Sequence, residues 1–159
     1  MTCHRKWPMI LLTVFVLFLT QCGFGQSKYI RKFRPLADSL SAEYGIPASV
    51  ILGVAIVESG SGTSRNCKLL HNHFGIIGKN DLMKTHGIKS RYKQYPDSRT
   101  CYIAFCKLVK KRKYYHKLKG NNDYTLWLEA MSQSGYSEIP LQWKERISAA
   151  IKKNKLSAS

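Results

Sequence analysis

Glu58 is the acidic residue whose surroundings best suit catalysis. It ends an almost wholly apolar segment, residues 48–57, and a turn of serine and glycine, residues 59–62, follows it. Apolar neighbours and the negative end of a helix dipole both disfavour a carboxylate, so both should raise the pKa of this side chain. A carboxylic acid that stays protonated near neutral pH can donate a proton to the leaving oxygen of a glycosidic bond. The alternative is an ordinary helix-end residue, with its carboxylate in solvent or bonded to amides of the turn.

Two other short motifs follow Glu58 in the chain. One is Asn-His-Phe-Gly-Ile at residues 72–76, and the other is Gly135-Tyr136. His71 and His73 would share one face of an extended segment, but two histidines without a third ligand rarely form a metal site. We therefore expect neither a metal nor another cofactor.

The elements that must position these motifs are mostly helices. Pro35 suits the first position of a helix that runs to about Tyr44, where Gly45 ends it. Pro47 begins a second segment over residues 48–57, and its length after a tight turn favours a buried helix over a buried strand.

Three more helices are predicted in the second half of the chain. Asp97 is the expected N-cap of a helix that fades near residues 110–113, and another follows Asp123 and ends at Gly135. The last helix runs from about Pro140 to Lys152. Apolar residues at helical spacing give the predicted buried stripes: Tyr102, Phe105, Cys106 and Val109; Leu126, Trp127, Ala130 and Met131; Trp143, Ile147, Ala150 and Ile151.

Residues 71–95 show a different pattern. Glycines stand at 75, 78 and 87, Asn80-Asp81 is a turn signal, and residues 91–95 alternate roughly in character. This pattern predicts a small, irregular β-hairpin. The expected fold class is therefore α+β, predominantly helical, with one domain over residues 26–159.

Charge is the outlier of the composition. The 159 residues include 26 Lys and Arg against 9 Asp and Glu, which gives a net charge of +17. A field of this strength favours polyanionic partners, which could be nucleic acid, an anionic membrane surface or a carboxylate-bearing polymer. With 44% hydrophobic residues, a disordered polar chain is excluded.

Residues 1–25 predict a signal peptide that is cleaved near Gly25. A basic stretch at residues 4–6 precedes an apolar stretch at 9–20, and glycines flank Phe24. The alternatives are an uncleaved anchor over residues 7–24 and lipid attachment at Cys22. Export argues against nucleic acid, and we expect an exported, periplasmic or envelope-associated monomer with no stable membrane span in the mature chain.

Cleavage would leave three cysteines, Cys67, Cys101 and Cys106. Exported proteins can form disulfides, yet three cysteines cannot all pair. Cys101 and Cys106 point to different faces of a predicted helix, so we expect Cys67 to pair with Cys106.

Three stretches, in this order, resemble a glucosaminidase family that cleaves bacterial peptidoglycan. This is glycoside hydrolase family 73, whose flagellar-type domain has a lysozyme-like fold. In that family a buried helix ends in Glu-Ser-Gly-x-Gly, matched by residues 58–62, and Asn-x-Phe-Gly-Ile follows, matched by residues 72–76. A Gly-Tyr-Ala-type motif is matched in part by Gly135-Tyr136, and the likeness covers about residues 35–152. The resemblance implies a lysozyme-like fold with a small β-hairpin lobe, and a hydrolase of β-1,4 bonds at N-acetylglucosamine in peptidoglycan.

The resemblance also implies roles for single residues. Glu58 would be the general acid, and Tyr136 would line the cleft and orient the sugar's acetamido group or an attacking water. The expected substrate-binding residues are Ser59, Asn72, Phe74 and Gly75, with Phe74 under the cleft floor. Carboxylates of peptidoglycan would suit the basic residues that bracket the proposed cleft, which are Lys68, Lys79, Lys84, Lys89, Arg91 and Lys93.

One departure from the family concerns the second acid. Many relatives place a glutamate in the hairpin, whereas this chain has no glutamate between Glu58 and Glu129. Asp81 is the candidate for that role, although it also suits a turn, and Asp97 is better explained as a helix cap. Single-acid chemistry or assistance by the substrate's N-acetyl group is the alternative.

Two other functions stay open. A lytic transglycosylase would use the same glutamate and leave anhydro sugar ends, so product mass distinguishes it from a hydrolase, which adds water. A catalytically weak module that binds cell wall or polyanions is favoured by the missing second acid and the high charge.

Overall fold

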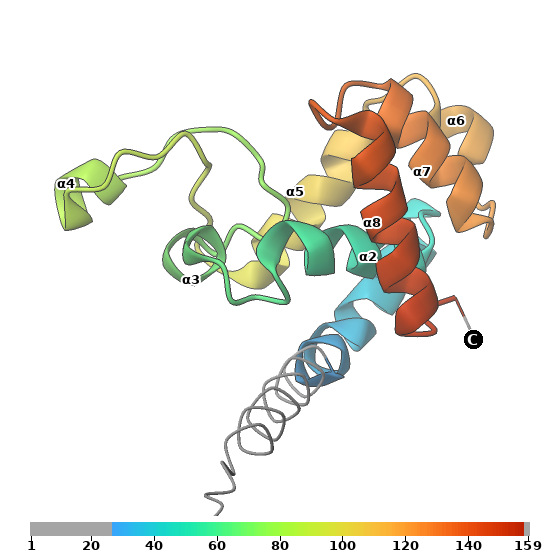
Figure 1. The fold of residues 1–159 in the computed structure, drawn as a ribbon, viewed down its shortest axis with the longest axis horizontal. Coiled ribbons are helices and arrows are strands. Elements are labelled where there is room, and N and C mark those ends of the chain that lie inside the picture. The colour runs from blue at the N-terminus through green and yellow to red at the C-terminus, as the bar shows by residue number, and fades with distance from the viewer. Residues whose placement is uncertain (1–26, 158–159) are drawn as a thin grey trace, which may run out of the picture.

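The computed structural model describes residues 27–157, and the predicted leader with its alternatives lies outside them. A first helix is described over residues 27–44. The helices that follow are α2 (Ala48–Ser59), α3 (Arg65–Leu70), α4 (Leu82–His86), α5 (Ser98–Lys110), α6 (Tyr115–Leu118), α7 (Tyr124–Gln133) and α8 (Pro140–Lys153). Figure 1 shows α2 in the middle, with α8 crossing it. Residues 71–95, here called the excursion, extend away from the other helices and carry α4. None of the helices within residues 27–157 is both long and apolar enough to cross a membrane.

The first helix corrects one prediction. A helix that begins at Pro35 is wrong, because the chain is already helical at residue 27 and continues through the proline. Tyr29, Phe33 and Leu40 are buried along one side of this helix. Proline has no backbone N–H, so one hydrogen bond of the helix is lost at Pro35. Burial of the apolar stripe stabilises the helix by more than this loss destabilises it.

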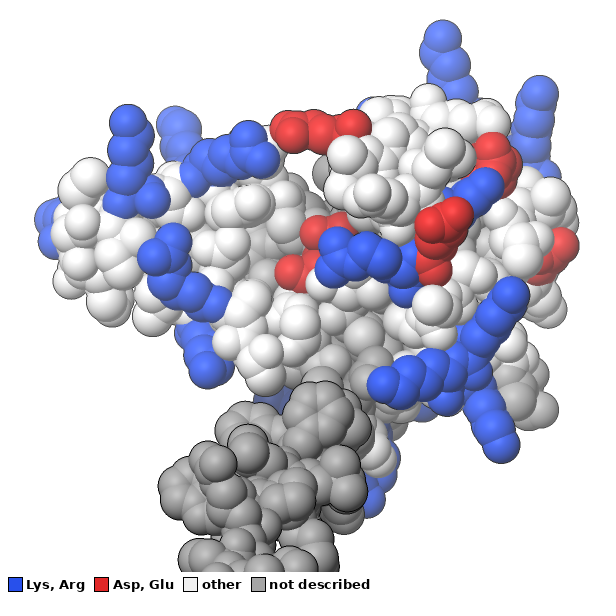
Figure 2. Space-filling model, viewed as in Figure 1, with Lys and Arg blue, Asp and Glu red and all other residues white. Residues whose placement is uncertain are grey.

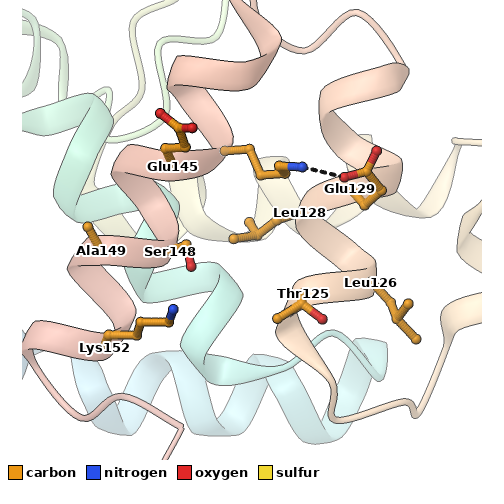
Figure 3. Close-up of a pocket in the computed structure, with 9 residues that line it drawn as sticks. Thr125, Leu126, Leu128, Glu129, Glu145, Ser148, Ala149 and Lys152 are labelled. Atoms are coloured by element: carbon orange, nitrogen blue, oxygen red, sulfur yellow. Dashed lines mark hydrogen bonds and ion pairs between the residues drawn. The ribbon is translucent and has the colours of Figure 1, made fainter.

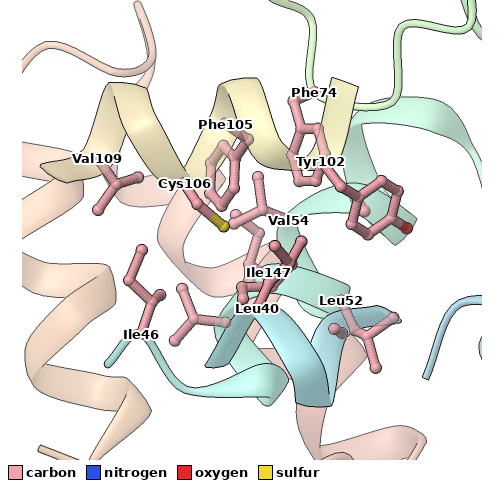
Figure 4. Packing of buried hydrophobic residues seen from close by; sticks show 14 of the residues in the cluster. Leu40, Ile46, Leu52, Val54, Phe74, Tyr102, Phe105, Cys106, Val109 and Ile147 are labelled. Atoms are coloured by element: carbon pink, nitrogen blue, oxygen red, sulfur yellow. The ribbon is translucent and has the colours of Figure 1, made fainter. Parts of the chain in front are cut away.

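The core is built around α2, which is buried over residues 49–56, as the apolar run predicts. Side chains from the first helix, α5 and α8 converge on it, among them Leu40, Phe105 and Ile147 (Figure 4). Gly53 is what lets α8 approach so closely. A Cβ atom at Gly53 would lie 2.7 Å from Cγ1 of Ile151 and 3.1 Å from Cγ2 of Ile147.

The caps of two later helices agree with the sequence. The Asp97 side chain accepts a hydrogen bond from the backbone amide of Thr100, and Asp123 does the same for Thr125. The prediction that Leu126 faces inward is wrong, since 47% of this residue is exposed, while Trp127 beside it is fully buried.

The predicted β-hairpin is not confirmed. Within the described residues the excursion contains one isolated antiparallel bridge, between Ile77 and Tyr92, and no regular strand. The side-chain amide of Asn80 donates to the carbonyls of Ser90 and Tyr92, at 2.9 and 2.8 Å. A side chain thus takes the place that backbone amides hold in a ladder, and the helix α4 forms between the two extended segments.

The predicted Cys67–Cys106 disulfide is wrong, because Cys67, Cys101 and Cys106 are all buried free thiols. Cys67 Sγ lies 3.4 Å from Nδ1 of His73, and Cys101 Sγ accepts a hydrogen bond from the backbone amide of His73 at 3.3 Å. Cys106 packs in the hydrophobic core instead.

Candidate active site

The end of α2 positions Glu58. Gly60, with φ of 56°, caps the helix in the left-handed conformation that glycine adopts without strain. The hydroxyl of Ser59 donates to the carbonyl of Ala55 at 2.6 Å and accepts from the amide of Gly62 at 2.8 Å. Ser59 is 0% exposed, so its side chain offers no surface to a substrate. It fixes the turn from which Glu58 projects.

The two oxygens of the half-buried Glu58 carboxyl group have different neighbours. Trp143, on α8, donates its indole N–H to Oε1 at 2.7 Å. The other oxygen, Oε2, lies beside Gly75, where a Cβ atom would approach it to 3.3 Å. One oxygen is therefore held by α8, and the second faces backbone that carries no side chain.

Burial is the main influence on the charge of Glu58. Desolvation raises the pKa of this carboxyl group above its ordinary value, while the hydrogen bond from Trp143 and the positive charge of Arg146 act in the opposite direction. Since desolvation exceeds the other two, the protonated form is favoured to a higher pH than in a solvated glutamate. That is the property a general acid needs.

The loop at residues 72–76 is shaped by Asn72, which is 1% exposed. Its amide group donates to the carbonyls of Ile76 and Lys93, both at 2.8 Å, and its oxygen accepts from the amides of Phe74 and Ile76. All of its hydrogen-bonding groups are thus used within the protein. Asn72 thereby holds Gly75, with φ of 67°, against Glu58.

Phe74 and Tyr136 complete the surroundings of Glu58. The ring of Phe74 is buried and stacks on Phe105, with centroids 4.1 Å apart. The half-buried Tyr136 donates its hydroxyl to the carbonyl of Phe74 at 3.1 Å, and its ring lies 5.1 Å from that of Trp143. Burial and the charge of Glu58 raise the pKa of Tyr136 well above its ordinary value, so its hydroxyl keeps its proton.

The structure does not bring Asp81 to this group. Asp81 is exposed and precedes α4, which lies at the far end of the excursion from α2 (Figure 1). Its side chain makes no cap hydrogen bond. Asp97 likewise lies elsewhere, with its carboxylate on the amide of Thr100 at 2.7 Å.

The surface around the excursion is mostly basic. Figure 2 shows separate Lys and Arg side chains that project mainly from the edges of the visible face, and a hollow between the excursion and the side formed by α7 and α8. Acidic atoms gather near this hollow. Within residues 27–157, no group of three His, Cys, Asp or Glu side chains could hold a metal ion.

Comparison with known proteins decides the family. A family model described as glucosaminidase, mannosyl-glycoprotein endo-β-N-acetylglucosaminidase, matches residues 34–156. The chain belongs to the glucosaminidase family. It is a glycoside hydrolase of the endo-β-N-acetylglucosaminidase type, and the resemblance of its three motifs to this family is confirmed. No curated protein sequence matches it significantly.

Solved structures share the predominantly helical, lysozyme-like fold of this glucosaminidase. The catalytic domain of the autolysin Auto from Listeria monocytogenes has a TM-score of 0.66 at 20% identity, covering 84% of this chain and 86% of that one. A peptidoglycan hydrolase from Sphingomonas sp. A1 has a TM-score of 0.65 at 21% identity, covering 82% and 90%. A truncated glycoside hydrolase domain of FlgJ from Salmonella typhimurium has a TM-score of 0.65 at 18% identity, covering 82% and 97%.

Sequence reasoning missed two residues at the site of this glucosaminidase. The helical spacing of Trp143 favours core packing, and it is indeed buried, yet its N–H is bonded to Glu58. Arg146, three residues further along α8, lowers the pKa of the same carboxyl group. No local signal in the sequence indicates either contact, because both depend on the close packing of α8 on α2.

A cavity of about 590 Å³ lies between α7 and α8 (Figure 3). The ion pair between Lys144 and Glu129, at 2.6 Å, joins the two helices there. Neither Glu58 nor Trp143 lines this cavity. The Lys144 ammonium group lowers the pKa of Glu129 in this cavity, whereas burial raises the pKa of Glu58 outside it.

Proposed function

We propose that this glucosaminidase is an exported peptidoglycan hydrolase that cleaves β-1,4 bonds at N-acetylglucosamine, with Glu58 as the general acid. The observation that carries the proposal is the environment of Glu58: a half-buried carboxyl group, held at one oxygen by Trp143 and bare at the other beside Gly75. The names of its structural neighbours, an autolysin and a peptidoglycan hydrolase, support this substrate. The predicted leader supports export.

The proposed reaction begins with proton transfer. Oε2 of Glu58 donates a proton to the glycosidic oxygen as the C–O bond breaks, so the leaving sugar departs as a neutral alcohol. Burial raises the pKa of Glu58 and so favours the form that carries this proton, and the hydrogen bond from Trp143 keeps the carboxyl group in one orientation. The glycan would lie in the hollow between the excursion and the side formed by α7 and α8 (Figure 2).

Tyr136 is proposed to order the other side of the reacting sugar. Its hydroxyl is protonated and already donates to the Phe74 carbonyl, so it is held close to the loop that contacts Glu58. From this place it can accept a hydrogen bond from the substrate's acetamido N–H or from a water. Gly75 leaves the space in which the sugar would lie.

The second group of the mechanism is open to a direct test. Asp81 remains the only acid that the sequence offers from the excursion as a partner, but it lies at the start of α4. We therefore favour assistance by the acetamido group, or a water held by Tyr136, over a second carboxylate. Asp81→Asn should then retain glycan cleavage, and loss of cleavage in a folded Asp81→Asn protein would restore Asp81 as the second acid.

The test of the proposal is Glu58→Gln, assayed on purified peptidoglycan by zymography and mass analysis of released fragments. Gln keeps an oxygen for the Trp143 hydrogen bond, but its amide group is not an acid and cannot transfer a proton to the leaving oxygen. Cleavage should therefore be lost, while the circular dichroism spectrum and melting temperature stay close to those of the parent. The matched control is Glu145→Gln, an exposed glutamate on α8. Full activity in Glu58→Gln would reject the assignment.

The same products distinguish the rival functions. Fragments that carry the mass of an added water identify a hydrolase, whereas anhydro ends identify a transglycosylase. Wall binding without released fragments in the parent protein would identify a binding module.

A further inference from the structure

A second concave site lies away from Glu58. It is a cavity of about 310 Å³ between the first helix, the turn after α2, and α3. Lys28 and Lys32 of the first helix and Lys68 of α3 line it, together with His71. Neither Glu58 nor Trp143 takes part in it. Lys68, which the sequence placed beside the proposed cleft, thus lines this pocket.

The lining of the pocket carries an excess of positive charge, and the nearest compensating group is Asp97, which adjoins Ser98 and interacts with His71 from outside the lining. The lining itself contains three lysines and no Asp or Glu. Lys28 and Lys32 are four residues apart on one helix, so they share a face and repel each other. Within residues 27–157 the two ion pairs are Arg34–Asp38 and Lys144–Glu129, and neither involves a lysine of this pocket.

The floor of the pocket is polar and buried. His73 is 3% exposed, with Nδ1 2.7 Å from the hydroxyl of Tyr29 and Nε2 2.9 Å from Oγ of Ser98. Tyr29 lies in turn 2.9 Å from the hydroxyl of Tyr102. Ser98 is half-buried, lines the pocket and has His73 as its side-chain partner, so its hydroxyl can still take part in a second hydrogen bond.

The floor is also uncharged near neutral pH. Burial, with the charges of His71 and Lys32, lowers the pKa of His73 to about 4, so the ring is neutral. Burial raises the pKa of Cys67 to about 11, so its thiol stays protonated and is a poor nucleophile despite its contact with His73. The site therefore suits binding and not catalysis.

We propose that this pocket binds a phosphate group, as a function separate from glycan cleavage. The lining supplies three lysines, and a lysine ammonium group binds a phosphate as a point charge. The hydroxyl of Ser98 can donate from the floor. At about 310 Å³ the pocket is near the lower end of ligand sites, which run from about 300 to 1,000 Å³, so it suits a phosphate with a small substituent and not a length of glycan.

The test is calorimetric titration of the folded protein at low ionic strength with three probes. These are inorganic phosphate, glycerol 3-phosphate as a monoester, and glycerophosphoglycerol as a diester. We expect saturable binding of at least one probe at one site per chain. Lys32→Gln with Lys68→Gln should weaken that binding by about tenfold for each lysine removed, because a charge-assisted hydrogen bond has roughly that effect on affinity.

The matched control is Lys113→Gln with Lys117→Gln, which removes the same charge at two exposed lysines outside the pocket. Its binding should equal that of the parent. Saturation by inorganic phosphate assigns the site to a free anion, and saturation by the diester alone assigns it to phosphate on a polymer or lipid; either result supports the proposal. Absence of saturable binding, or an equal loss in the control, overturns it.

Two further measurements keep the test independent. Glu58→Gln should bind the probe as tightly as the parent, so a failure of the proposed catalytic function leaves this result unaffected. If the double variant unfolds, the single variants Lys32→Gln and Ser98→Ala are titrated instead, and unchanged affinity in both folded proteins would equally overturn the proposal.

Discussion

Trp143→Phe tests how the protein controls the proton on Glu58. This change keeps an aromatic ring in the packing between α2 and α8 but removes the N–H that donates to Oε1 at 2.7 Å. A hydrogen bond donated to a carboxylate stabilises the charged form. Without it, the pKa of Glu58, which burial already raises, should rise further.

The size of the effect follows from the contact. A hydrogen bond to a charged group is worth roughly 1.5 to 3 kcal/mol, and the half-buried position of Glu58 favours the lower end of that range. Since about 1.36 kcal/mol corresponds to one pKa unit, the pKa of Glu58 should rise by about one unit. A general acid works in its protonated form, so activity is lost as the pH rises through its pKa, and the alkaline limb of the profile should move upward by about one pH unit.

The assay is the initial rate of glycan cleavage as kcat/KM across the pH range, for the parent and for Trp143→Phe. Trp127→Phe is the matched control, since Trp127 is also buried but donates its N–H to the carbonyl of Asn121 at 2.9 Å. That variant should lose stability without a shift of the limb. An alkaline limb that stays in place or moves down in Trp143→Phe, or that moves equally in Trp127→Phe, would refute the reasoning.

Three other changes test the parts that support Glu58. Gly53→Ala should lower the free energy of unfolding by about 1 to 3 kcal/mol in urea titrations, because the new methyl group meets Ile151 at 2.7 Å. The same change should cost less in a protein that already carries Ile151→Ala. Full additivity of the two changes would contradict this contact. Asn72→Asp should lower the free energy of unfolding by about 2 kcal/mol, because the carbonyls of Ile76 and Lys93 lose their donor. Amide hydrogen exchange over residues 76–93 should become faster, and unchanged exchange would contradict this role of Asn72. Arg146→Gln removes a positive charge that lowers the pKa of Glu58, so the alkaline limb of kcat should move to slightly higher pH at low salt. At about 1 M salt, where the Debye length falls to about 3 Å, the variant should match the parent. A difference that persists at high salt would exclude a screened charge effect of this exposed residue.

The parts of the site that could be predicted are those fixed by local sequence. An almost wholly apolar segment, residues 48–57, between Pro47 and a glycine turn has few alternatives to a buried helix, so the location of Glu58 in the last turn of α2 follows. Asp97 and Asp123 could be recognised as caps, because each precedes a helical stripe and needs a partner only two or three residues away.

The parts that could not be predicted depend on contacts between distant segments. Ser59 and Asn72 carry groups that suit a ligand equally well, and only the folded chain shows that these groups bond to the protein itself. The path of the excursion is decided by the side chain of Asn80, which no strand propensity describes. The burial of Tyr29 and Phe33 carries the first helix through a proline that by itself indicates a start.

The close approach of α8 to α2 links stability to chemistry in this protein. Gly53 has no side chain, so Ile147 and Ile151 of α8 pack directly against the middle of α2. This packing places Trp143, one turn before Ile147 on α8, where its N–H can bond to Glu58. A buried acid without such a donor would be free to rotate, and a solvated acid with one would be ionised at neutral pH. Because desolvation exceeds the effects of Trp143 and Arg146, the carboxyl group is held in one orientation and its pKa is still raised, which neither influence achieves alone. If Glu58 is the general acid, the place where its proton is delivered therefore depends on Gly53, which lets α8 approach, as well as on Glu58 itself.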